Sequence, residues 1–422
     1  MNHTALERLL RRLEKLHPKL IDLSLGRLLK LLKKLQNPHL KLPKVIHIAG
    51  TNGKGSTLSF IKQILMEHSF KVHCYISPHL ISITERFVIS NKNITEQKLH
   101  NAFKHVELIN NKEPITYFEI TTATAFYLFS KSKADFLILE TGLGGRLDAT
   151  NVIKESMLDI ITPISYDHRE YLGKTLKKIT SEKLGIIKNS SSIIISKQEK
   201  EIKNFILKKL IKYKNKKIFY EKDYKILNKK NNTFSITLNK RRFIFHKPLL
   251  LGEHQIDNAA LAIVASYEIK RRGYIIKKNL INQALIKTFW PGRLEKFYIK
   301  NLPFFLDGAH NVAGAQQLAK FLSINNQNTW LLIGMLNNKD IFLFLSSLKK
   351  YIAGVIAIKI PGEKNAFTTS EISNVCKKLN ILCIKQKNII SAQNYLLKYI
   401  NPKRVLVTGS LYLIGKVRRL LV

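Results

Sequence analysis

The segment from Val45 to Thr57 constrains the fold more than any other part of this chain of 422 residues. It begins with VIHIA, which is apolar apart from one histidine, and continues directly into the glycine-rich run GTNGKGST. An apolar helical pattern follows, so the predicted order is strand, loop and helix. In such a loop, backbone N–H groups close around phosphate oxygens, and the start of the helix adds partial positive charge. The segment therefore predicts a phosphate loop in an α/β domain.

Two kinds of side chain in this loop suit nucleotide chemistry. Lys54 can neutralise charge that develops on a phosphoryl group, and a hydroxyl of Ser56 or Thr57 can bind magnesium. Gly55 separates the lysine from the hydroxyls, so the spacing differs from the common GxxxxGK[ST] pattern. The alternative is a glycine-rich turn within a sheet. We favour the phosphate loop because strand, loop, lysine, hydroxyls and helix occur in the order that nucleotide binding needs.

Short apolar runs alternate with helical patterns along most of the chain, which is typical of βα units around a buried parallel sheet. The runs lie at 45–49, 71–77, 134–140, 159–165 and 191–196, and again at 304–310, 329–334, 354–360, 381–385 and 404–410. Between Lys216 and Gly252, runs of period two indicate a small antiparallel insert. Because the chain is too long for one core, we expect a P-loop ATP-binding domain over 1–294 and a smaller Rossmann-like domain over 295–422.

The formal net charge of +42, from 71 basic and 29 acidic residues, would attract nucleic acid or another polyanion. The lysines are dispersed along the chain, however, and are not gathered into one stripe with interleaved aromatic residues. A general compositional bias is therefore the preferred explanation, and we expect no specific nucleic-acid partner. ATP is anionic too, so the charge does not decide between enzyme classes.

The start of the chain and the cysteines indicate the compartment. Leucines from Leu6 to Leu16 recur at helical spacing among charged residues, which predicts an amphipathic helix instead of a signal peptide. No uninterrupted apolar run is long enough to span a bilayer. Cys74, Cys376 and Cys383 are too few and too scattered for a disulfide framework or a zinc site. We expect a soluble cytoplasmic protein without a membrane partner, in which these cysteines are ordinary core residues.

Glu140 is the first candidate metal ligand outside the loop. It ends the run ADFLILE, at the edge of the sheet where doubly wound folds place their ligand-binding groups. Magnesium prefers a few carboxylate oxygens together with phosphates and water, so a carboxylate that faces the phosphate loop is well suited to it. The alternative is a buried glutamate that is satisfied by hydrogen bonds within the protein.

Three motifs carry a resemblance to a known family: GTNGKGST at 50–57, SPHL at 77–80 and ETGLGGRLDATN at 140–151. Further matches are HPKLIDLSLGR at 17–27, YFE at 117–119, DH at 167–168, EKLGIIK at 182–188, WPGR at 290–293, LDGAHN at 306–311 and GSLYLIG at 409–415. With these motifs the sequence resembles the folylpolyglutamate synthase and dihydrofolate synthase family, within the Mur ligase superfamily. The resemblance covers nearly the whole chain.

The resemblance implies an ATP site with two magnesium ions, and a monovalent cation is a further candidate cofactor. The residues it assigns to ATP are Asn52, Gly53, Lys54, Gly55, Ser56, Thr57, Asn258, Arg293 and Asp307. The residues it assigns to the metals are Ser56, Ser77, Glu140, His168 and Lys183, the last as a carbamate formed with carbon dioxide. Lys54, His168 and Lys183 would be catalytic. A carbamate needs a lysine that can lose its proton, which burial beside other cations favours.

The resemblance also implies where the other substrates bind. A pterin-bearing acceptor would contact Ile21, Asp22, Leu23, Thr116, Tyr117, Phe118, Glu119, Leu147, Asp148 and Ala149, and L-glutamate would lie near His310 and Asn311. For Asp148 an alternative exists within the same loop, because Arg146 is close enough in sequence to form a salt bridge with it.

The implied activity is that of an ATP-dependent ligase. A carboxylate of dihydropteroate or tetrahydrofolate would attack the γ-phosphorus of ATP, and the amine of L-glutamate would displace phosphate from the acyl phosphate. We expect a monomer, since ligases of this architecture complete the site with their own two domains. The alternatives are an enzyme with only one of the two activities, a ligase of cell-wall precursors from the same superfamily, and a basic NTPase that depends on nucleic acid.

Overall fold

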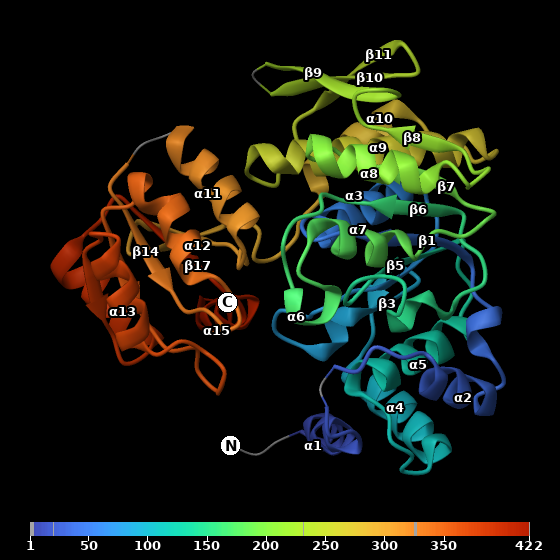
Figure 1. Ribbon diagram of the computed structural model, residues 1–422, viewed down its shortest axis with the longest axis horizontal. Coiled ribbons are helices and arrows are strands. Elements are labelled where there is room, and N and C mark those ends of the chain that lie inside the picture. The colour runs from blue at the N-terminus through green and yellow to red at the C-terminus, as the bar shows by residue number, and fades with distance from the viewer. Residues whose placement is uncertain (1–3, 20, 231, 325–326, 422) are drawn as a thin grey trace. The chain divides into compact units, whose positions relative to one another are not determined.

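The structure is a computed structural model, and it describes residues 4–19, 21–230, 232–324 and 327–421. The chain divides into two compact units (Figure 1). Unit 1 comprises Met1–Lys247 and Asp257–Thr288, and unit 2 comprises Pro248–Ile256 and Phe289–Val422. The chain therefore enters unit 2 briefly and returns to unit 1 before it continues into the rest of unit 2. The functional boundary expected after residue 294 stays a prediction.

Unit 1 is built on an eight-stranded sheet in the order β4-β3-β2-β5-β1-β6-β7-β8. The strands are β1 (Lys44–Ala49), β2 (Val72–Tyr75), β3 (Phe87–Ile89), β4 (Lys92–Asn93), β5 (Phe136–Glu140), β6 (Leu158–Ile161), β7 (Ser192–Ile195) and β8 (Lys217–Phe219). All pairs from β2 to β8 are parallel, and β3 and β4 extend the sheet in antiparallel fashion. The five apolar runs predicted for this part of the chain are confirmed as β1, β2, β5, β6 and β7.

Helices cover both faces of this sheet. They are α1 (Ala5–Leu13), α2 (Gly26–Lys34), α3 (Lys54–Glu67), α4 (Glu96–Asn110), α5 (Tyr117–Ser130), α6 (Arg169–Leu172), α7 (Leu176–Leu184), α8 (Lys200–Leu210), α9 (Glu253–Arg271) and α10 (Lys278–Lys287). The 3-10 turns are η1 (Glu14–Leu16), η2 (Pro38–Leu40), η3 (Ile83–Arg86) and η4 (Ala149–Val152). The helix α9 begins in unit 2 and continues into unit 1 at Asp257.

Side-chain alternation along β1 assigns the helices to the two faces. Val45 and Ala49 point to the same face, because side chains two residues apart in a strand share a side. Val45 belongs to a core formed with α1, α2, α4 and α5, and Ala49 belongs to a core formed with α7 and α8. Phe136 of β5 points the other way, where its ring meets that of Tyr274 at 4.9 Å, and α3 packs against α10. The sheet is therefore the middle layer of three.

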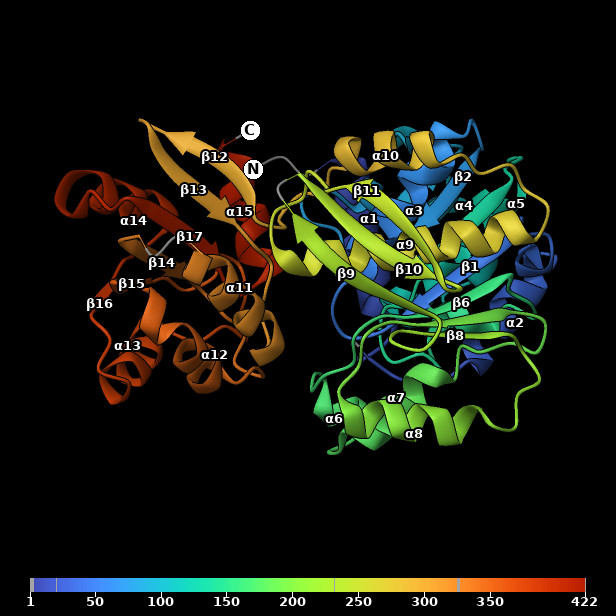
Figure 2. The same cartoon turned by 90° about the horizontal axis from the view of Figure 1, so that it is seen from above.

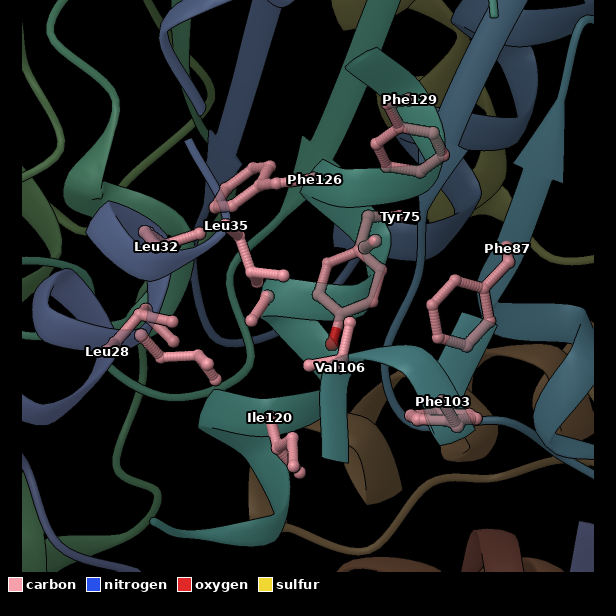
Figure 3. Packing of buried hydrophobic residues seen from close by; sticks show 14 of the residues in the cluster. Leu28, Leu32, Leu35, Tyr75, Phe87, Phe103, Val106, Ile120, Phe126 and Phe129 are labelled. Atoms are coloured by element: carbon pink, nitrogen blue, oxygen red, sulfur yellow. The ribbon is translucent and has the colours of Figure 1, made fainter. Parts of the chain in front are cut away.

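An aromatic cluster fixes the positions of β2, β3, α4 and α5 (Figure 3). Tyr75 is buried at its centre, with its ring 5.7 Å from that of Phe87, which in turn lies 5.9 Å from Phe103. The Tyr75 hydroxyl forms hydrogen bonds with Thr121 and Thr122 of α5, at 3.0 and 3.1 Å. Burial of each such ring contributes about 1.5–3 kcal/mol, and the hydroxyl pairs specify how α5 lies against the sheet.

The predicted antiparallel insert is present, but it starts later than expected. It has three strands in the order β11-β10-β9, namely β9 (Tyr224–Lys230), β10 (Thr233–Leu238) and β11 (Arg241–His246). The prediction began the insert at Lys216, which was wrong for β8. That strand pairs in parallel with β7, from Ile193↔Lys217 to Ile195↔Phe219. A strand of three residues is too short for its period to show which sheet it joins.

Unit 2 is a six-stranded sheet in the order β12-β13-β17-β14-β15-β16. Its strands are β12 (Glu295–Ile299), β13 (Leu302–Leu306), β14 (Thr329–Ile333), β15 (Gly354–Ala357), β16 (Cys383–Lys385) and β17 (Arg404–Thr408). Five of them were predicted, and they pair in parallel. The sequence analysis missed β12, which pairs antiparallel with β13 at the edge of the sheet. The doubly wound form expected for this part is confirmed.

The helices of unit 2 are α11 (Val312–Ile324), α12 (Ile341–Leu348), α13 (Thr369–Lys378), α14 (Ile389–Tyr395) and α15 (Leu411–Leu421), with short turns η5 (Lys349–Tyr351) and η6 (Leu396–Ile400). Within this unit, α11, α12 and α13 lie on one side of the sheet, and α14 and α15 lie on the other (Figure 2). This arrangement follows from the strand order, because β13, β14, β15 and β16 progress in one direction and the chain then reverses to reach β17.

The amphipathic helix expected at the start of the chain is confirmed. The helix α1 has a capping box between Thr4 and Glu7 and packs its leucines into the core of unit 1. All three cysteines are free, with Cys74 and Cys376 buried. Within the described ranges, no helix combines the length and the apolarity needed to cross a membrane.

Candidate active site

The phosphate loop connects β1 to α3 in a conformation that two glycines permit. Gly53 has a φ of 85°, in the left-handed region, and a side chain there would overlap the amide of Asn258. A side chain at Gly50 would overlap Thr162, which directly follows β6. The loop is also fixed from outside, because the Thr51 N–H donates to the carbonyl oxygen of Pro163 at 2.9 Å. The loop is thus held in one shape at the start of α3, where the first N–H groups of a helix have no partner within the helix and can bind an anion.

Two lysines converge on this loop. Lys54, at the first position of α3, donates from Nζ to the carbonyl oxygens of Gly50 and Thr51, at 3.2 and 3.3 Å. Lys183, near the end of α7, donates from Nζ to the same Gly50 oxygen at 2.9 Å. Lys183 is 133 residues away in sequence and only 4% exposed. The structure therefore brings together two of the three predicted catalytic residues.

The surroundings of Lys183 favour its neutral form. Burial, followed by the positive charge of Lys54, lowers the pKa of Lys183 to about 7, and Asp167 and Asp148 oppose this change. A buried amine with such a pKa is half unprotonated near neutral pH, and only the unprotonated amine can react with carbon dioxide. The chemistry that the resemblance implies for this lysine is therefore compatible with its environment.

Glu140 and Ser77 form the pair expected at one metal. Glu140 lies at the carboxyl end of β5, it is buried, and its Oε2 accepts a hydrogen bond from the Ser77 N–H at 3.2 Å. The Ser77 hydroxyl oxygen is buried and has no hydrogen-bond partner within the described residues. The hydroxyl oxygen of Thr57, on the first turn of α3, is in the same condition. The unfilled hydroxyl oxygen of Ser77, next to the Glu140 carboxylate, fits a hard cation such as magnesium.

The structure does not form a cage of protein ligands for a metal. In the part of the chain that the structure describes, no three His, Cys, Asp or Glu side chains are grouped closely enough to bind a metal ion. His168 caps the start of α6, with its Nε2 3.9 Å from Asp167 Oδ2, and Ser56 is buried on α3. A site with so few carboxylates suits magnesium, which keeps several waters and takes oxygens from substrate phosphates.

The three predicted ATP residues outside the loop divide between the units. Asn258, on α9, lies against Gly53 in unit 1. Arg293 and Asp307 belong to unit 2, where Asp307 accepts hydrogen bonds from the backbone N–H groups of Leu294 and Ala309 at 3.0 and 2.9 Å. Burial raises the pKa of Asp307, and the positive charge of Arg293 opposes this rise. Arg293 and Asp307 are thus neighbours within their own unit.

The residues predicted for L-glutamate follow Asp307 in unit 2. His310 interacts through Nδ1 with the carbonyl oxygen of Gly308 at 2.8 Å. Asn311 is buried and directly precedes α11. Its side-chain oxygen accepts a hydrogen bond at 2.8 Å from the N–H of Gly314, which lies in the first turn of that helix. Both side chains therefore help to shape the turn from β13 to α11, and their role towards glutamate stays a prediction.

The first two segments predicted for the acceptor are joined by an arginine. Arg27 of α2 donates to Asp22 Oδ2 and to Glu119 Oε2, each at 3.2 Å. Glu119 also completes a capping box with Thr116 at the start of α5, and its second oxygen, Oε1, is buried without a hydrogen-bond partner among the described residues. Ile21 and Leu23 flank Asp22 and are half-buried. This bridge places residues 21–23 beside residues 116–119.

The third predicted segment adjoins the second. The ring of Phe118 lies directly against Gly142, at the start of the loop that carries Leu147, Asp148 and Ala149. Tyr117, the neighbour of Phe118, has the guanidinium of Arg86 over its ring at 5.9 Å. The structure therefore brings all three predicted acceptor segments together within unit 1.

Asp148 organises its loop from a buried position. Its carboxylate accepts hydrogen bonds from the Leu143 N–H at 2.8 Å, from the Thr150 N–H at 3.0 Å and from the Thr150 hydroxyl at 2.5 Å. Burial raises the pKa of Asp148, and these hydrogen bonds oppose the rise. The alternative of a salt bridge with Arg146 is wrong, because Arg146 pairs with Glu182 of α7 at 3.0 Å.

Sequence reasoning missed three residues that support these segments. Arg27, Thr150 and His47 make hydrogen bonds to partners 92, 2 and 103 residues away, respectively. Arg27 and Thr150 lie inside motifs used for the resemblance, so a search for polar partners of Asp22 and Asp148 could have found them. His47 carried one signal, as the single polar residue of VIHIA.

Comparison with known proteins agrees with this geometry. Residues 48–266 match the Mur ligase middle domain, and residues 293–420 match the C-terminal domain of dihydrofolate synthetase. The chain is 32% identical over 420 residues to the dihydrofolate synthase/folylpolyglutamate synthase of Bacillus subtilis, with 94% of each chain covered.

Solved structures give the same result. A structure of Escherichia coli FolC with DHPP and ADP superposes with a TM-score of 0.88 at 27% identity, covering 99% of each chain. A bifunctional folylpolyglutamate synthase/dihydrofolate synthase with Mn, AMPPNP and L-glutamate bound gives 0.86 at 26% identity, covering 100% of each. The chain belongs to the dihydrofolate synthase/folylpolyglutamate synthase family, within the Mur ligase superfamily.

Proposed function

We propose that this protein is an ATP-dependent ligase that joins L-glutamate to dihydropteroate, giving dihydrofolate, and to tetrahydrofolate, giving folylpolyglutamates. The observation that carries the proposal is the convergence of Lys54 and Lys183 on the carbonyl oxygen of Gly50 in the phosphate loop. The relatives that share the fold have been solved with ADP, or with AMPPNP, Mn and L-glutamate, which supports the same substrates here.

The reaction activates a carboxylate and then forms an amide. The acceptor carboxylate attacks the γ-phosphorus of ATP, ADP leaves, and an acyl phosphate forms. The amine of L-glutamate then attacks the acyl carbon, phosphate leaves, and the amine nitrogen loses a proton. Lys54 stabilises the negative charge on the transferring phosphoryl group, and the backbone N–H groups at the start of α3 orient the phosphates.

The residues that would hold magnesium are Ser56 or Thr57, Ser77, Glu140, His168 and Lys183 as a carbamate. When bound, the metal ions supply positive charge that neutralises the phosphate oxygens during transfer. In the carbamate, the Lys183 nitrogen bonds to the carbon of carbon dioxide and releases a proton, so that a cationic side chain becomes an anionic oxygen ligand. Glu140, whose Oε2 accepts a hydrogen bond from the Ser77 N–H at 3.2 Å, would provide a carboxylate, and Ser77 would provide its hydroxyl.

The acceptor would bind where its three predicted segments meet. Phe118 beside Gly142 offers an aromatic face to a flat ring. The unfilled oxygen of Glu119, Oε1, is an acceptor for an N–H group of that ring, because a buried carboxylate oxygen without a donor is costly. Arg27 holds Glu119 and Asp22 in place for this contact.

The test is mass spectrometry of products after pure protein is incubated with ATP, magnesium and L-glutamate. One reaction contains dihydropteroate and a parallel one contains tetrahydrofolate. Product in both supports the bifunctional enzyme, and product in one identifies a single activity. Absence of product in both contradicts the proposal, and ATP turnover with cell-wall precursors or with nucleic acid would then identify one of the alternatives.

The proposal includes a cytoplasmic monomer that needs no nucleic acid. All the groups that converge on Gly50 come from a single chain, so a second copy is not needed to supply them. Light scattering after gel filtration tests the oligomeric state. Binding to nucleic acid that disappears as salt is raised, without any stimulation of ATP turnover, would be the nonspecific effect of the +42 charge.

A further inference from the structure

A buried chain of hydrogen bonds connects the strand of the phosphate loop to the third acceptor segment. His47 of β1 lies with its Nε2 2.8 Å from the hydroxyl oxygen of Thr150. The Thr150 hydroxyl in turn lies 2.5 Å from Asp148 Oδ1. His47 and Thr150 are completely buried, and Asp148 is 2% exposed. We call these three residues the His–Thr–Asp chain.

The direction of each hydrogen bond follows from the groups involved. The Asp148 carboxylate is an acceptor, so the Thr150 hydroxyl donates its proton to Oδ1. With that proton committed, the Thr150 oxygen can only accept from His47, and His47 must carry its proton on Nε2. His47 Nδ1 is buried with no hydrogen-bond partner among the described residues, as expected for the unprotonated nitrogen. Burial, followed by Lys188, lowers the pKa of His47 to about 3, which keeps the ring neutral at pH 7.

The position of His47 allows the His–Thr–Asp chain to connect β1 with the loop that follows β5. His47 lies three residues before Gly50, on the central strand of the sheet, with its Cα opposite Leu139 of β5 and Asp159 of β6. The neighbouring Asp159 does not compete for it, because its carboxylate bonds to the Ser156 hydroxyl and the Lys188 N–H at 2.7 and 2.8 Å. The side chain of His47 therefore forms its hydrogen bond with Thr150, in the loop that follows β5.

We propose that His47 is a positioning residue for the acceptor substrate. As the Nε2–H tautomer, His47 orients Thr150, and Thr150 orients Asp148. Residues 147–149 are thereby held at a fixed position relative to the phosphate loop, which follows the strand of His47. This inference rests on the proposed function, in which residues 147–149 contact the pterin-bearing acceptor. The acceptor carboxylate must lie within reach of the γ-phosphorus, and small misplacements of a substrate lower the rate steeply.

Two matched pairs of variants test the proposal by steady-state kinetics. His47→Leu and Thr150→Val remove the hydrogen-bonding group, whereas His47→Gln and Thr150→Ser keep a donor or hydroxyl at the same place. Loss of one hydrogen bond in the chain should raise the KM for dihydropteroate by about tenfold and leave the KM for ATP unchanged. His47→Gln and Thr150→Ser should retain most of the wild-type KM. In the double variant His47→Leu/Thr150→Val the two effects should not add, because both act on one chain.

Several results would overturn the proposal. Equal loss in His47→Gln and His47→Leu would mean that packing, and not donation, is what matters. An equal rise in the KM for ATP would place the role of His47 at the phosphate loop alone. If the variants fail to fold, nitrogen NMR of histidine-labelled wild-type protein decides, since a proton on Nδ1 of His47 would contradict the chain.

The same NMR measurement separates this proposal from the proposed function. If the wild-type protein forms no product with either pteroyl acceptor, the proposed function fails, and the assigned role of His47 towards that acceptor fails with it. The Nε2–H tautomer would still be observed in that case, because the hydrogen-bond chain does not depend on the substrate. If product forms and the tautomer is Nδ1–H, only the inference about His47 fails.

Discussion

Lys54 and Lys183 donate to a single acceptor, the carbonyl oxygen of Gly50, at 3.2 and 2.9 Å. Two ammonium groups so close to one another repel, and the buried one is the less stable as a cation. Lys54 is half-buried, whereas Lys183 is 4% exposed, and burial followed by the charge of Lys54 lowers the pKa of Lys183 to about 7. The same contact therefore prepares the two lysines for different chemistry.

Replacement of Lys54 by Ala should nearly abolish turnover and leave the fold intact. The Lys54 side chain donates hydrogen bonds to the carbonyl oxygens of Gly50 and Thr51, so the main loss in the variant is the positive charge at the transferring phosphoryl group. We expect kcat/KM to fall by at least about a hundredfold, the scale seen when one charge-stabilising donor is removed. Circular dichroism checks the fold. Full ligase activity in this variant would contradict the assignment of the phosphate loop.

Lys183→Ala should also be inactive, but a short carboxylic acid such as acetate should restore part of its activity. The added carboxylate would replace the anionic oxygens of the carbamate. Lys177→Ala, an exposed lysine on the same helix that pairs with Glu201, is the matched control and should behave as wild type. Two negative results together would contradict this role: small carboxylates restore neither kcat nor KM in the variant, and wild-type protein labelled with carbon-13 dioxide shows no carbamate signal.

The rate should fall as the pH drops below about 7, the pKa to which burial and Lys54 lower Lys183. The sign follows from the chemistry, because the protonated amine cannot react with carbon dioxide and its fraction grows as pH falls. Raised bicarbonate should shift the acid limb of the profile to lower pH. A profile that is flat between pH 8 and pH 6 would show that Lys183 does not titrate in the reaction.

Arg27→Ala should weaken binding of the acceptor without changing the KM for ATP. The variant leaves buried Glu119 without its cationic partner, which costs about 1–3 kcal/mol of stability, and it releases Asp22 as well. We expect the KM for dihydropteroate to rise and the thermal midpoint to fall. Arg12→Ala, which removes an exposed pair with Glu107, is the control and should change neither value. An unchanged KM for dihydropteroate in Arg27→Ala would separate α2 from the acceptor site.

Acid should destabilise unit 1 through His47. Its pKa is about 3 in the folded protein and near 6.5 in the unfolded chain, so below pH 6.5 the unfolded state binds a proton that the folded state does not. The stability that depends on neutral His47 is thus complete above pH 6.5 and is lost as pH falls towards 3, by about 1.4 kcal/mol per pH unit. Thermal midpoints between pH 7 and pH 4 should fall less steeply in His47→Gln than in wild type. Identical slopes would show that His47 does not contribute.

The strands were predictable wherever they are buried on both faces. Runs such as FLILE in β5 and RVLVT in β17 are buried along their whole length and are apolar except at their ends, because a parallel sheet between two helical layers hides both sides of each strand. β12 has the burial of an edge strand, with Lys296 and Tyr298 exposed, and its local pattern is correspondingly weak. The fold was therefore readable except at sheet edges, where β8 and β12 lie.

The site was predictable only where a motif carried it. The phosphate loop and Glu140 followed from local order and from their place at strand ends, and the structure brings Lys183 of α7 to the carbonyl oxygen of Gly50 in that loop. The hydrogen bonds of Arg27 to Glu119 and of His47 to Thr150 depend on strand register and helix packing across about a hundred residues. No periodicity within a window of the sequence encodes such distances.

The central strand β1 leaves almost no room for insertions or deletions. It is paired in parallel on both sides, so a deletion between His47 and Gly50 would either turn the histidine to the opposite face or draw the phosphate loop into the sheet. A change of length at the hairpin turn between β10 and β11 would not shift the register of either strand in this way. The turn consists of Asn239 and Lys240, which lie outside the strands and adopt positive φ. A library of chain-length variants should therefore accumulate survivors at that turn and none along these few residues of β1.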